Sequence, residues 1–437
     1  MKILIIGLTS SGLGGMEYHN LGNYIIMEPL IDELQKTFTE CQIRTSIQMS
    51  DEYCQKWNIV SLKEKRFYTY GLYTGVKTFI DIFKIGFWKL FALSGLKLNF
   101  LLNSSSLLSE INNADLVIDF SGDIYGDNAF WTKFLESNAE LIFARMLNKK
   151  IAMLIGSPGP FKSTWRQILA KSNLMNIDLL TNREAKSTEF LEYIGIKGNH
   201  IYSTACPSVL FQKEPEELMS EIYQKEGLDK DRNRPLVGLI LCGWNMPVAP
   251  FNKWPREDWE YQSFIELIDY LISEKNVDVC VMSHQNGTDK DGNFIKQNDH
   301  KIIGRLLALI GNKYTQDRLF SLKGLYTAAE SKAIIGKFDI LVSGRVHGAV
   351  QGLSQCIPTA IIDYGHEPRA HKLKGFAEIY DVSENVMDPL NIEQMKLVIS
   401  QTIDNKEQYA QKLQKRVPQV QELALKNFVL LKELSEK

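Results

Sequence analysis

Apolar runs and segments of helical periodicity alternate along most of the chain. An apolar run over residues 2–8 precedes a Ser/Gly-rich turn at 9–15 and a helical pattern over 24–38. This order predicts βα units, in which successive strands lie parallel in one sheet. The runs expected as strands cover residues 2–8, 114–120, 150–155, 178–181, 236–242, 277–283, 340–343 and 359–363. The segments expected as helices cover residues 24–38, 185–194, 258–272, 326–337, 348–354 and the region beyond 389.

The alternation is interrupted near residues 207–235, where a charged segment with few apolar anchors precedes a strong strand pattern. Such a stretch is typical of a domain boundary. We therefore expect an N-terminal α/β domain over 1–211, a C-terminal α/β domain over 212–385 and a helical tail over 386–437. Two Rossmann-like domains facing across a cleft form the GT-B architecture. Because ligands of open α/β sheets bind beyond the carboxyl ends of the strands, the expected site lies in that cleft.

Composition and charge agree with a folded protein of this size. The chain has 437 residues, of which 44% are hydrophobic and 23% charged, and its net charge is −2. These values argue against disorder, and the near-neutral charge gives no global attraction for nucleic acid. None of the six cysteines forms a CxxC pair. We therefore expect reduced thiols, a cytoplasmic protein and no structural zinc.

Residues 71–102 are unusually apolar, and four lysines interrupt them, namely Lys77, Lys84, Lys89 and Lys97. A mostly buried helix that covers the sheet is the favoured interpretation, because the lysines do not gather on one side as in a membrane-surface helix. Peripheral contact with the inner face of the membrane is the alternative. No stretch reaches the roughly 18 consecutive apolar residues of a membrane span, so no transmembrane helix is expected.

Arg345 and His347 are the sharpest candidates for chemistry. They follow the apolar run 340–343 and precede a helical pattern that begins near Gly348. Backbone N–H groups at a helix start attract anions, and an arginine adds a fork for carboxylate or phosphate. The imidazole can transfer a proton near neutral pH. The alternative is structural, with Arg345 capping a carbonyl and His347 satisfied by its neighbours.

Two further groups follow strand patterns in the N-terminal half. Arg183 and Glu184 stand between a strand and a helix, where the same anion argument applies, although an ordinary surface ion pair is the alternative. The second group could orient hydroxyls or act as a base, and ordinary turn chemistry is its alternative. Its members are Asp119, Ser121, Gly122, Asp123 and Asp127.

The glycines of 10–15, with Asn20, Gly22 and Asn23, could admit a substrate close to the backbone. They do not match the dinucleotide fingerprint, which argues against a nicotinamide enzyme. His284 follows the strand pattern 277–283 and is expected to face the cleft, as are His19, His366 and His371. No HExxH motif or acidic calcium loop occurs, so a tightly bound metal is not expected.

Five short segments, in this order, resemble the motifs of the polysaccharide pyruvyl transferase family. The last resembles its Arg-x-His signature and is followed by Tyr364 and Lys372. Three segments depart from the family pattern, with Asn23 in place of Asp, Ser-Gly-Asp in place of three glycines, and Met-Ser-His in place of Pro-His. The segments are Asn20-Leu21-Gly22-Asn23, Asp119 to Asp123, Arg183 to Ser187, Met282-Ser283-His284 and Ser343 to Ala349.

The family transfers a pyruvyl group from phosphoenolpyruvate to two hydroxyls of a sugar and forms a cyclic ketal. The resemblance therefore implies this donor, a sugar or lipid-linked oligosaccharide as acceptor, and neither cofactor nor metal. His347 is the implied acid that protonates the donor's methylene carbon, and Asp123 the implied group that positions the acceptor hydroxyl. The implied substrate-binding residues are Arg183, Arg345, Gly122, Asn23, His284, Tyr364 and Lys372.

Two other functions are compatible with the same architecture. One is a glycosyltransferase that uses a nucleotide-sugar donor, although no pair of glutamates at the spacing expected for ribose binding occurs near 340–370. The other is a binding protein that retains the fold without the chemistry.

Overall fold

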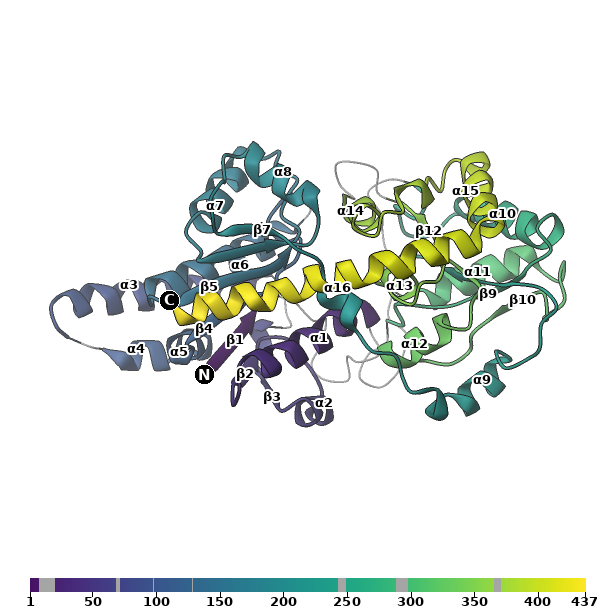
Figure 1. Cartoon of the computed structure of the whole chain (residues 1–437). Helices are drawn as coiled ribbons and strands as arrows, with labels where there is room; N and C mark the ends of the chain where they lie inside the picture. The colour runs from purple at the N-terminus through teal and green to yellow at the C-terminus, as the bar shows by residue number, and fades with distance from the viewer. Residues whose placement is uncertain are drawn as a thin grey trace. The chain divides into compact units, whose positions relative to one another are not determined.

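The structure, a computed structural model, describes residues 1–7, 20–67, 71–96, 98–127, 129–242, 249–287, 298–364 and 371–437. They divide into two units, each built around one parallel β-sheet (Figure 1). Unit 1 comprises Met1–Met16, Leu30–Cys206 and Leu425–Lys437, and unit 2 comprises Glu17–Pro29 and Pro207–Ala424. The predicted two-domain α/β fold with C-terminal helices is therefore confirmed.

The sheet of unit 1 has seven strands. They are β1 (Lys2–Ile6), β2 (Gln42–Thr45), β3 (Ile59–Ser61), β4 (Leu116–Asp119), β5 (Lys150–Gly156), β6 (Leu179–Asn182) and β7 (Ile201–Ser203). Their order in the sheet is β3-β2-β1-β4-β5-β6-β7, with all neighbours parallel. The direction of strand addition reverses between β1 and β4, and ligands of such sheets bind at the carboxyl ends beside the reversal.

The helices of the N-terminal half cover this sheet. They are α1 (Leu21–Thr37), α2 (Asp51–Lys56), α3 (Leu72–Leu93), α4 (Asn99–Asn103), α5 (Ser106–Asn113), α6 (Trp131–Met146), α7 (Thr164–Leu174) and α8 (Ala185–Tyr193). One apolar cluster joins alternate strand residues such as Leu4, Val117 and Met153 to buried residues of α5 to α8. Helix α1 contains Pro29 in its interior rather than in its first turn, and its division between the units falls directly after Pro29.

The sheet of unit 2 has six strands. They are β8 (Leu236–Ile240), β9 (Asp278–Val281), β10 (Leu319–Ser321), β11 (Ile340–Ser343), β12 (Thr359–Ile362) and β13 (Val386–Met387). Their order is β10-β9-β8-β11-β12-β13, again entirely parallel, with the reversal between β8 and β11. The helices of this half are α9 (Ser220–Glu226), α10 (Gln262–Ser273), α11 (His300–Ile310), α12 (Ala328–Ile335), α13 (Val346–Leu353), α14 (His371–Ile379), α15 (Ile392–Asp404) and α16 (Lys406–Glu436).

The central strands confirm the expected apolar runs. Every residue of β4, β8 and β11 is buried, because helices cover both faces of a parallel sheet. In unit 2, one face packs on α10, α11 and α15, and the other packs on α9 and α12. The sequence did not predict β2, β3, β7 and β13. These strands have two to four residues, too few for a hydrophobic period to stand out.

Helix α3 corrects the favoured interpretation of residues 71–102, because it is not mostly buried. Within α3 only Thr74, Asp81 and Ile85 are buried. The buried Asp81 pairs with Arg66, which turns the polar stripe of the helix inward and the apolar side outward. A helix that is apolar around most of its circumference does not reveal from sequence which face packs. In the described part of the chain, no helix is both long and apolar enough to cross a membrane.

Candidate active site

Arg345 lies between a strand and a helix, as the sequence predicted, and that strand is at the reversal of the sheet of unit 2. It follows β11, whose neighbours are β8 and β12, and it is the N-cap residue of α13. Its backbone N–H donates to Ser343 Oγ at 3.2 Å, and the Ser343 hydroxyl donates to its carbonyl at 2.9 Å. The turn is therefore fixed locally. The N–H groups at the start of α13 form a suitable environment for an anion.

The guanidinium of Arg345 is held by two side chains. One terminal nitrogen donates to Gln285 Oε1 at 2.8 Å, and the other forms an ion pair with Asp299. Burial disfavours the charged form, but Asp299 raises the pKa of Arg345 above its ordinary value, so the arginine stays charged. Arg345 Nε is buried, and no described residue accepts a hydrogen bond from it. A buried donor of this kind is a natural partner for a substrate oxygen.

Asp299 also organises the loop that follows β9. Its Oδ2 accepts from the backbone N–H groups of His284, at 3.0 Å, and Gln285, at 2.8 Å. The carboxylate itself is fully buried. A single acid therefore fixes both the arginine and the backbone that carries His284.

His284 is fully buried beside Gly348, at the start of α13. Its Nε2 lies 3.2 Å from Gln351 Oε1, and the Gln351 amide nitrogen donates to Ala328 O at 3.0 Å. The amide orientation places the proton of His284 on Nε2 and leaves Nδ1 as an acceptor. Burial, together with the charge of Arg345, lowers the pKa of His284 from 6.5 to about 4. His284 is therefore neutral at pH 7 and is poorly suited to protonate carbon.

His347 differs from His284 because it is only half-buried. Its ring packs edge-on against Phe376 of α14, with ring centroids 6.3 Å apart. A Cβ on Gly22 would lie 2.6 Å from His347 Nδ1, so a glycine is needed where α1 approaches the imidazole. The starts of helices α1 and α13 therefore both lie beside His347.

The turn before α1 completes this group. Asn20 Oδ1 accepts from Gly22 N–H at 3.1 Å, and Asn23 N–H donates to Asn20 O at 3.0 Å. Asn23 is half-buried in the first turn of α1. This turn and the Arg345–His347 segment are more than 300 residues apart in sequence, yet both belong to unit 2.

Two other predicted binding residues lie in the same unit. Tyr364 is fully buried, and a Cβ on Gly344 would lie 2.2 Å from its ring. Its hydroxyl accepts from Cys242 N–H at 3.4 Å. Tyr364 therefore supports the β11–α13 turn from behind. Lys372 is half-buried in the first turn of α14.

Arg183 also stands between a strand and a helix, β6 and α8 of unit 1, but two strands away from β4, the strand at the reversal. Its Nε donates to Ser157 Oγ at 2.6 Å and lies 3.5 Å from Glu184 Oε2. Ser157 N–H in turn donates to Gly122 O at 2.9 Å. The turns after β4, β5 and β6 are therefore linked, and an Arg183 terminal nitrogen lies 4.0 Å from the Cβ position of Gly122. Gly122 has φ +64°, a conformation that favours glycine.

The acids of the turn after β4 have different roles. Asp119 accepts from Ser121 N–H at 2.8 Å and from the hydroxyls of Ser121 and Tyr125. It is fully buried, and burial raises its pKa despite these bonds. Asp119 therefore shapes the turn. Asp123 is half-buried in the turn itself, so it is the more accessible acid of the two.

The structure thus groups Arg345, His347, His284 and Asn23 in unit 2, and Arg183 with Gly122 in unit 1. Residues 10–15, His19 and His366 lie outside the described residues, as does the side chain of His371. Sequence reasoning missed three supporting residues, namely Ser157, Gln285 and Asp299. Ser157 and Gln285 stand in loops that follow predicted strands. Asp299 had no such signal, because it precedes α11 rather than following a strand.

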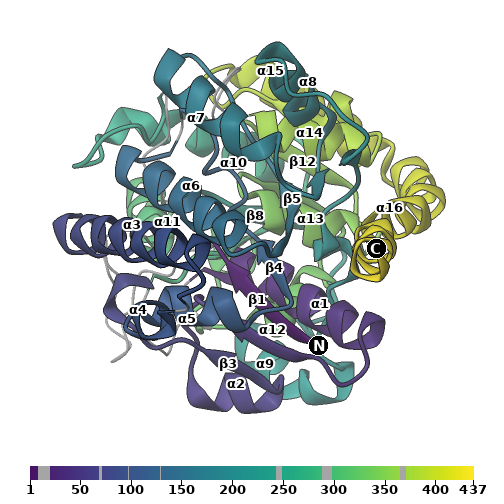
Figure 2. The same cartoon turned by 90° about the vertical axis from the view of Figure 1, so that its left-hand side faces the viewer.

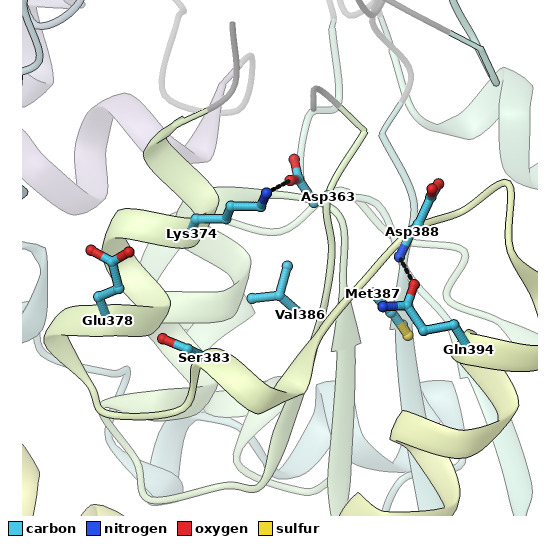
Figure 3. Close-up of a pocket in the computed structure, with 8 residues that line it drawn as sticks. All are labelled: Asp363, Lys374, Glu378, Ser383, Val386, Met387, Asp388 and Gln394. Atoms are coloured by element: carbon cyan, nitrogen blue, oxygen red, sulfur yellow. Dashed lines mark hydrogen bonds and ion pairs between the residues drawn. The ribbon is translucent and has the colours of Figure 1, made fainter. Parts of the chain in front are cut away.

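A separate pocket of about 260 Å³ lies beyond β12 and β13 (Figure 3). Three carboxylates line it, from Asp363, Glu378 and Asp388, against one ammonium, from Lys374. Lys374 Nζ lies 3.9 Å from Asp363 Oδ2. The excess of negative charge makes this pocket unfavourable for a phosphate or diphosphate. Among the described residues, no group of three or more His, Cys, Asp or Glu could hold a metal ion.

Comparison with models of protein families identifies the family of the chain. The family model for polysaccharide pyruvyl transferase matches residues 20–366, from the turn beside His347 to the segment after β12. This chain belongs to the polysaccharide pyruvyl transferase family. It is therefore a transferase of polysaccharide biosynthesis, and its family implies a glycan acceptor. No curated protein matches the chain.

Solved structures similar to this family member share its fold. A putative UDP-N-acetylglucosamine 2-epimerase from Listeria monocytogenes has a TM-score of 0.59 at 14% identity, covering 97% of this chain and 94% of its own. A glycosyltransferase from Rickettsia africae has a TM-score of 0.59 at 12% identity, covering 100% and 98%. A UDP-GlcNAc 2-epimerase from Neisseria meningitidis, bound to UDP-GlcNAc, has a TM-score of 0.57 at 13% identity, covering 99% and 100%. These likenesses support the GT-B fold.

Proposed function

We propose that this transferase moves a pyruvyl group from phosphoenolpyruvate to two hydroxyls of a glycan sugar and releases inorganic phosphate. The observation that carries the proposal is the grouping in unit 2 of Arg345, His347 and the starts of α1 and α13. A charged arginine and the N–H groups at the start of α13 suit a small dianionic donor. A partly accessible imidazole beside them suits a proton transfer.

The donor has a carboxylate and a phosphate on adjacent positions of one small molecule. Arg345 is assigned to one of these anions, since its guanidinium is charged and its Nε has no acceptor among the described residues. The side-chain amide of Asn23 and the first N–H groups of α13 provide neutral donors for the same anions. Arg183 is assigned to donor binding on charge grounds, and titration of the donor against Arg183 variants tests that assignment.

The reaction begins with a proton. His347 donates it to the methylene carbon, which becomes a methyl group and leaves positive charge on the carbon that bears the phosphate oxygen. The first acceptor hydroxyl adds to that carbon, and its proton passes to a base, for which Asp123 is the candidate. His284 is neutral at pH 7 because its pKa is about 4, so it is assigned to hydrogen bonding rather than to protonation.

The second half of the reaction closes the ketal. The carbon–oxygen bond to phosphate breaks, and the second hydroxyl adds to the same carbon. Of the two hydroxyl protons lost by the sugar, one replaces the proton taken from His347 and the other leaves with hydrogen phosphate. Atoms and charge therefore balance without an oxidant, a reductant or a metal ion.

The direct test is incubation of the purified protein with phosphoenolpyruvate and a panel of free and lipid-linked sugars. The expected result is phosphate release that depends on acceptor and a product heavier by a pyruvyl ketal. Incubation with nucleotide sugars is the comparison arm, because the similar folds include a UDP-GlcNAc epimerase. Sugar transfer from a nucleotide sugar with no ketal formation would replace the proposal by glycosyl transfer. Donor binding without phosphate release would indicate a binding protein.

A further inference from the structure

The outward face of α3 is a continuous apolar strip on the surface of unit 1. Six large side chains, spaced three or four residues apart, form its centre, and between 48% and 85% of each is exposed. They are Leu72, Val76, Phe79, Phe83, Phe87 and Leu90. At about 100° per residue this spacing puts all six on one side of the helix. Isolated exposed apolar residues are common on proteins, but a strip of this length marks an interaction site.

The strip is not the side by which α3 packs on unit 1, because a different side of the helix makes those contacts. That side consists of the buried Asp81, its ion-pair partner Arg66, and Ile85. Helix α3 also packs along α6, and the views in Figures 1 and 2 both show the two helices side by side. The polar anchor therefore faces the protein, and the apolar strip is left to face something else.

Lysines flank the strip on both sides. At the same helical spacing, Lys77 and Lys84 fall along one margin and Lys89 along the other, and none falls on the strip itself. Asp81 is the only acid between residues 71 and 109, and it is buried. The strip is therefore apolar and its margins are positively charged. The lysines do not gather on one side of the helix, but with the buried Asp81 marking the packed side, both margins border the exposed strip and their long side chains can reach the same lipid surface.

An apolar pocket of about 540 Å³ adjoins the strip on the same side of unit 1. Phe79 and Ile82 of α3 line it on one side, and Trp131 and Leu135 of α6 line it on the other. Trp131 is 59% exposed, and tryptophan is enriched where proteins meet the headgroup region of a bilayer. The apolar surface therefore extends from α3 across to the start of α6.

We propose that the apolar strip of α3 and the pocket beside α6 dock this enzyme on the surface of a membrane that contains anionic lipid. The apolar side chains enter the interface, and the flanking lysines contact lipid headgroups. A second copy of the chain is the weaker occupant, because two copies would bring like-charged lysine margins together. This inference does not depend on the proposed reaction, and its tests need neither donor nor acceptor.

The first test is co-sedimentation of the full chain with vesicles of phosphatidylcholine, with and without phosphatidylglycerol. The wild type is expected to sediment with both and more strongly with the anionic vesicles. Phe83→Glu/Phe87→Glu is expected to weaken binding at least tenfold, on the order of the loss for two charges placed in the interface. The matched control is Leu397→Glu/Val429→Glu, two sites exposed to a similar degree outside α3, which should bind as the wild type does.

The second test separates charge from apolar contact. Lys77→Gln/Lys89→Gln should reduce binding to anionic vesicles by about fivefold per lysine and leave binding to neutral vesicles unchanged. Thermal unfolding of each variant checks that the fold is retained. With vesicles of brominated lipid, quenching of tryptophan fluorescence should fall in Trp131→Phe and persist in Trp259→Phe, a control exposed to 54%.

The proposal is overturned if the folded wild type stays in the supernatant with both vesicles, or if the α3 double variant binds as well as the wild type. It is also overturned if light scattering shows that the wild type is a dimer that the α3 variant converts to a monomer while vesicle binding is absent from both. In that outcome the strip is an interface between copies.

Discussion

Arg183 and Arg345 each stand between a buried strand and a helix of their own unit, but different partners hold them. Arg345 pairs with the fully buried Asp299 and also with Gln285. Arg183 donates from Nε to the neutral hydroxyl of Ser157 and forms an ion pair of 3.5 Å with the buried Glu184. Removing Arg345 therefore leaves Asp299 buried without its ion-pair partner. Removing Arg183 breaks a longer contact with the buried Glu184, whose other oxygen still accepts from the Ser187 hydroxyl. The comparison teaches that an arginine proposed to bind the donor can also stabilise the fold, and that the burial and distance of its ion-pair partner determine how much stability its removal costs.

The unit 2 group also contains His347, the proposed proton donor, so the largest expected effect is there. His347→Ala should lower kcat by about 10²–10⁴, the usual contribution of a general acid, with little change in donor affinity. Phosphate release under saturating donor and acceptor measures it. His200→Ala, a half-buried histidine of unit 1 that contacts Leu174 O, is the control and should keep full activity. Unchanged turnover in His347→Ala would remove the imidazole from the mechanism.

Arg345→Ala should lower both stability and donor affinity. Breaking a buried ion pair from one side costs about 3–5 kcal/mol, because Asp299 is left charged and buried. Urea unfolding measures this loss. The double variant Arg345→Ala/Asp299→Asn should recover part of the stability but none of the donor affinity. Arg345→Lys should recover little of either, because an ammonium cannot contact Gln285 and Asp299 as the forked guanidinium does. Equal stability of the wild type and Arg345→Ala would contradict the partner argument.

His284 makes the stability of unit 2 depend on pH. Its folded pKa is about 4 and its unfolded value about 6.5, so the unfolded chain binds more protons between these values. The stability from this group is complete above pH 6.5 and declines as the pH falls toward 4, by about 3 kcal/mol. Urea unfolding at pH 7 and pH 4 measures the decline. His284→Gln should be less stable at pH 7 and should show a smaller decline, by about that amount.

Arg183→Ala should lower donor affinity as Arg345→Ala does, but with a much smaller loss of stability. The donor affinity should fall by about 10- to 150-fold, the range for charge-assisted hydrogen bonds, while stability changes by about 1 kcal/mol. Calorimetric titration with phosphoenolpyruvate measures the donor affinity, and urea unfolding measures the stability. If instead the KM for the acceptor rises and donor affinity is unchanged, Arg183 belongs to the sugar and its assignment to the donor is wrong.

The positions of Arg345 and His347 were predictable because the ends of buried strands can be recognised from the sequence. The buried run before Arg345 and the glycine after His347 were enough to place both at a helix start. The sequence could not predict that Asp299 holds Arg345, because an acid before a helix reads as an ordinary cap. The prediction that residues 71–102 are mostly buried was wrong for a related reason. The apolar residues of α3 surround most of the helix, and the side that packs is decided by one buried ion pair, Asp81 with Arg66.

The smallest expected effect concerns Gly22, which acts through His347 and not through either arginine. A Cβ there would lie 2.6 Å from His347 Nδ1, closer than real contacts allow, so Gly22→Ala must displace the imidazole or the start of α1. Because proton transfer depends on placement to within about an ångström, kcat should fall on the order of tenfold. The matched control is Gly304→Ala in α11, where an added Cβ meets no atom within 4 Å.

The two glycine variants should differ in activity and in their effect on the helix that contains them. Alanine at position 304 should stabilise its helix by about 0.5–1 kcal/mol and leave kcat unchanged. A Gly22→Ala enzyme that loses activity without losing donor affinity places the defect at the proton donor. Loss of donor affinity with unchanged kcat would instead mean that the start of α1 binds the donor and that His347 tolerates displacement. The pH dependence of kcat in the two variants then shows whether Gly22→Ala displaces the His347 imidazole or the start of α1. Only a displaced imidazole changes the pH at which turnover is half-maximal.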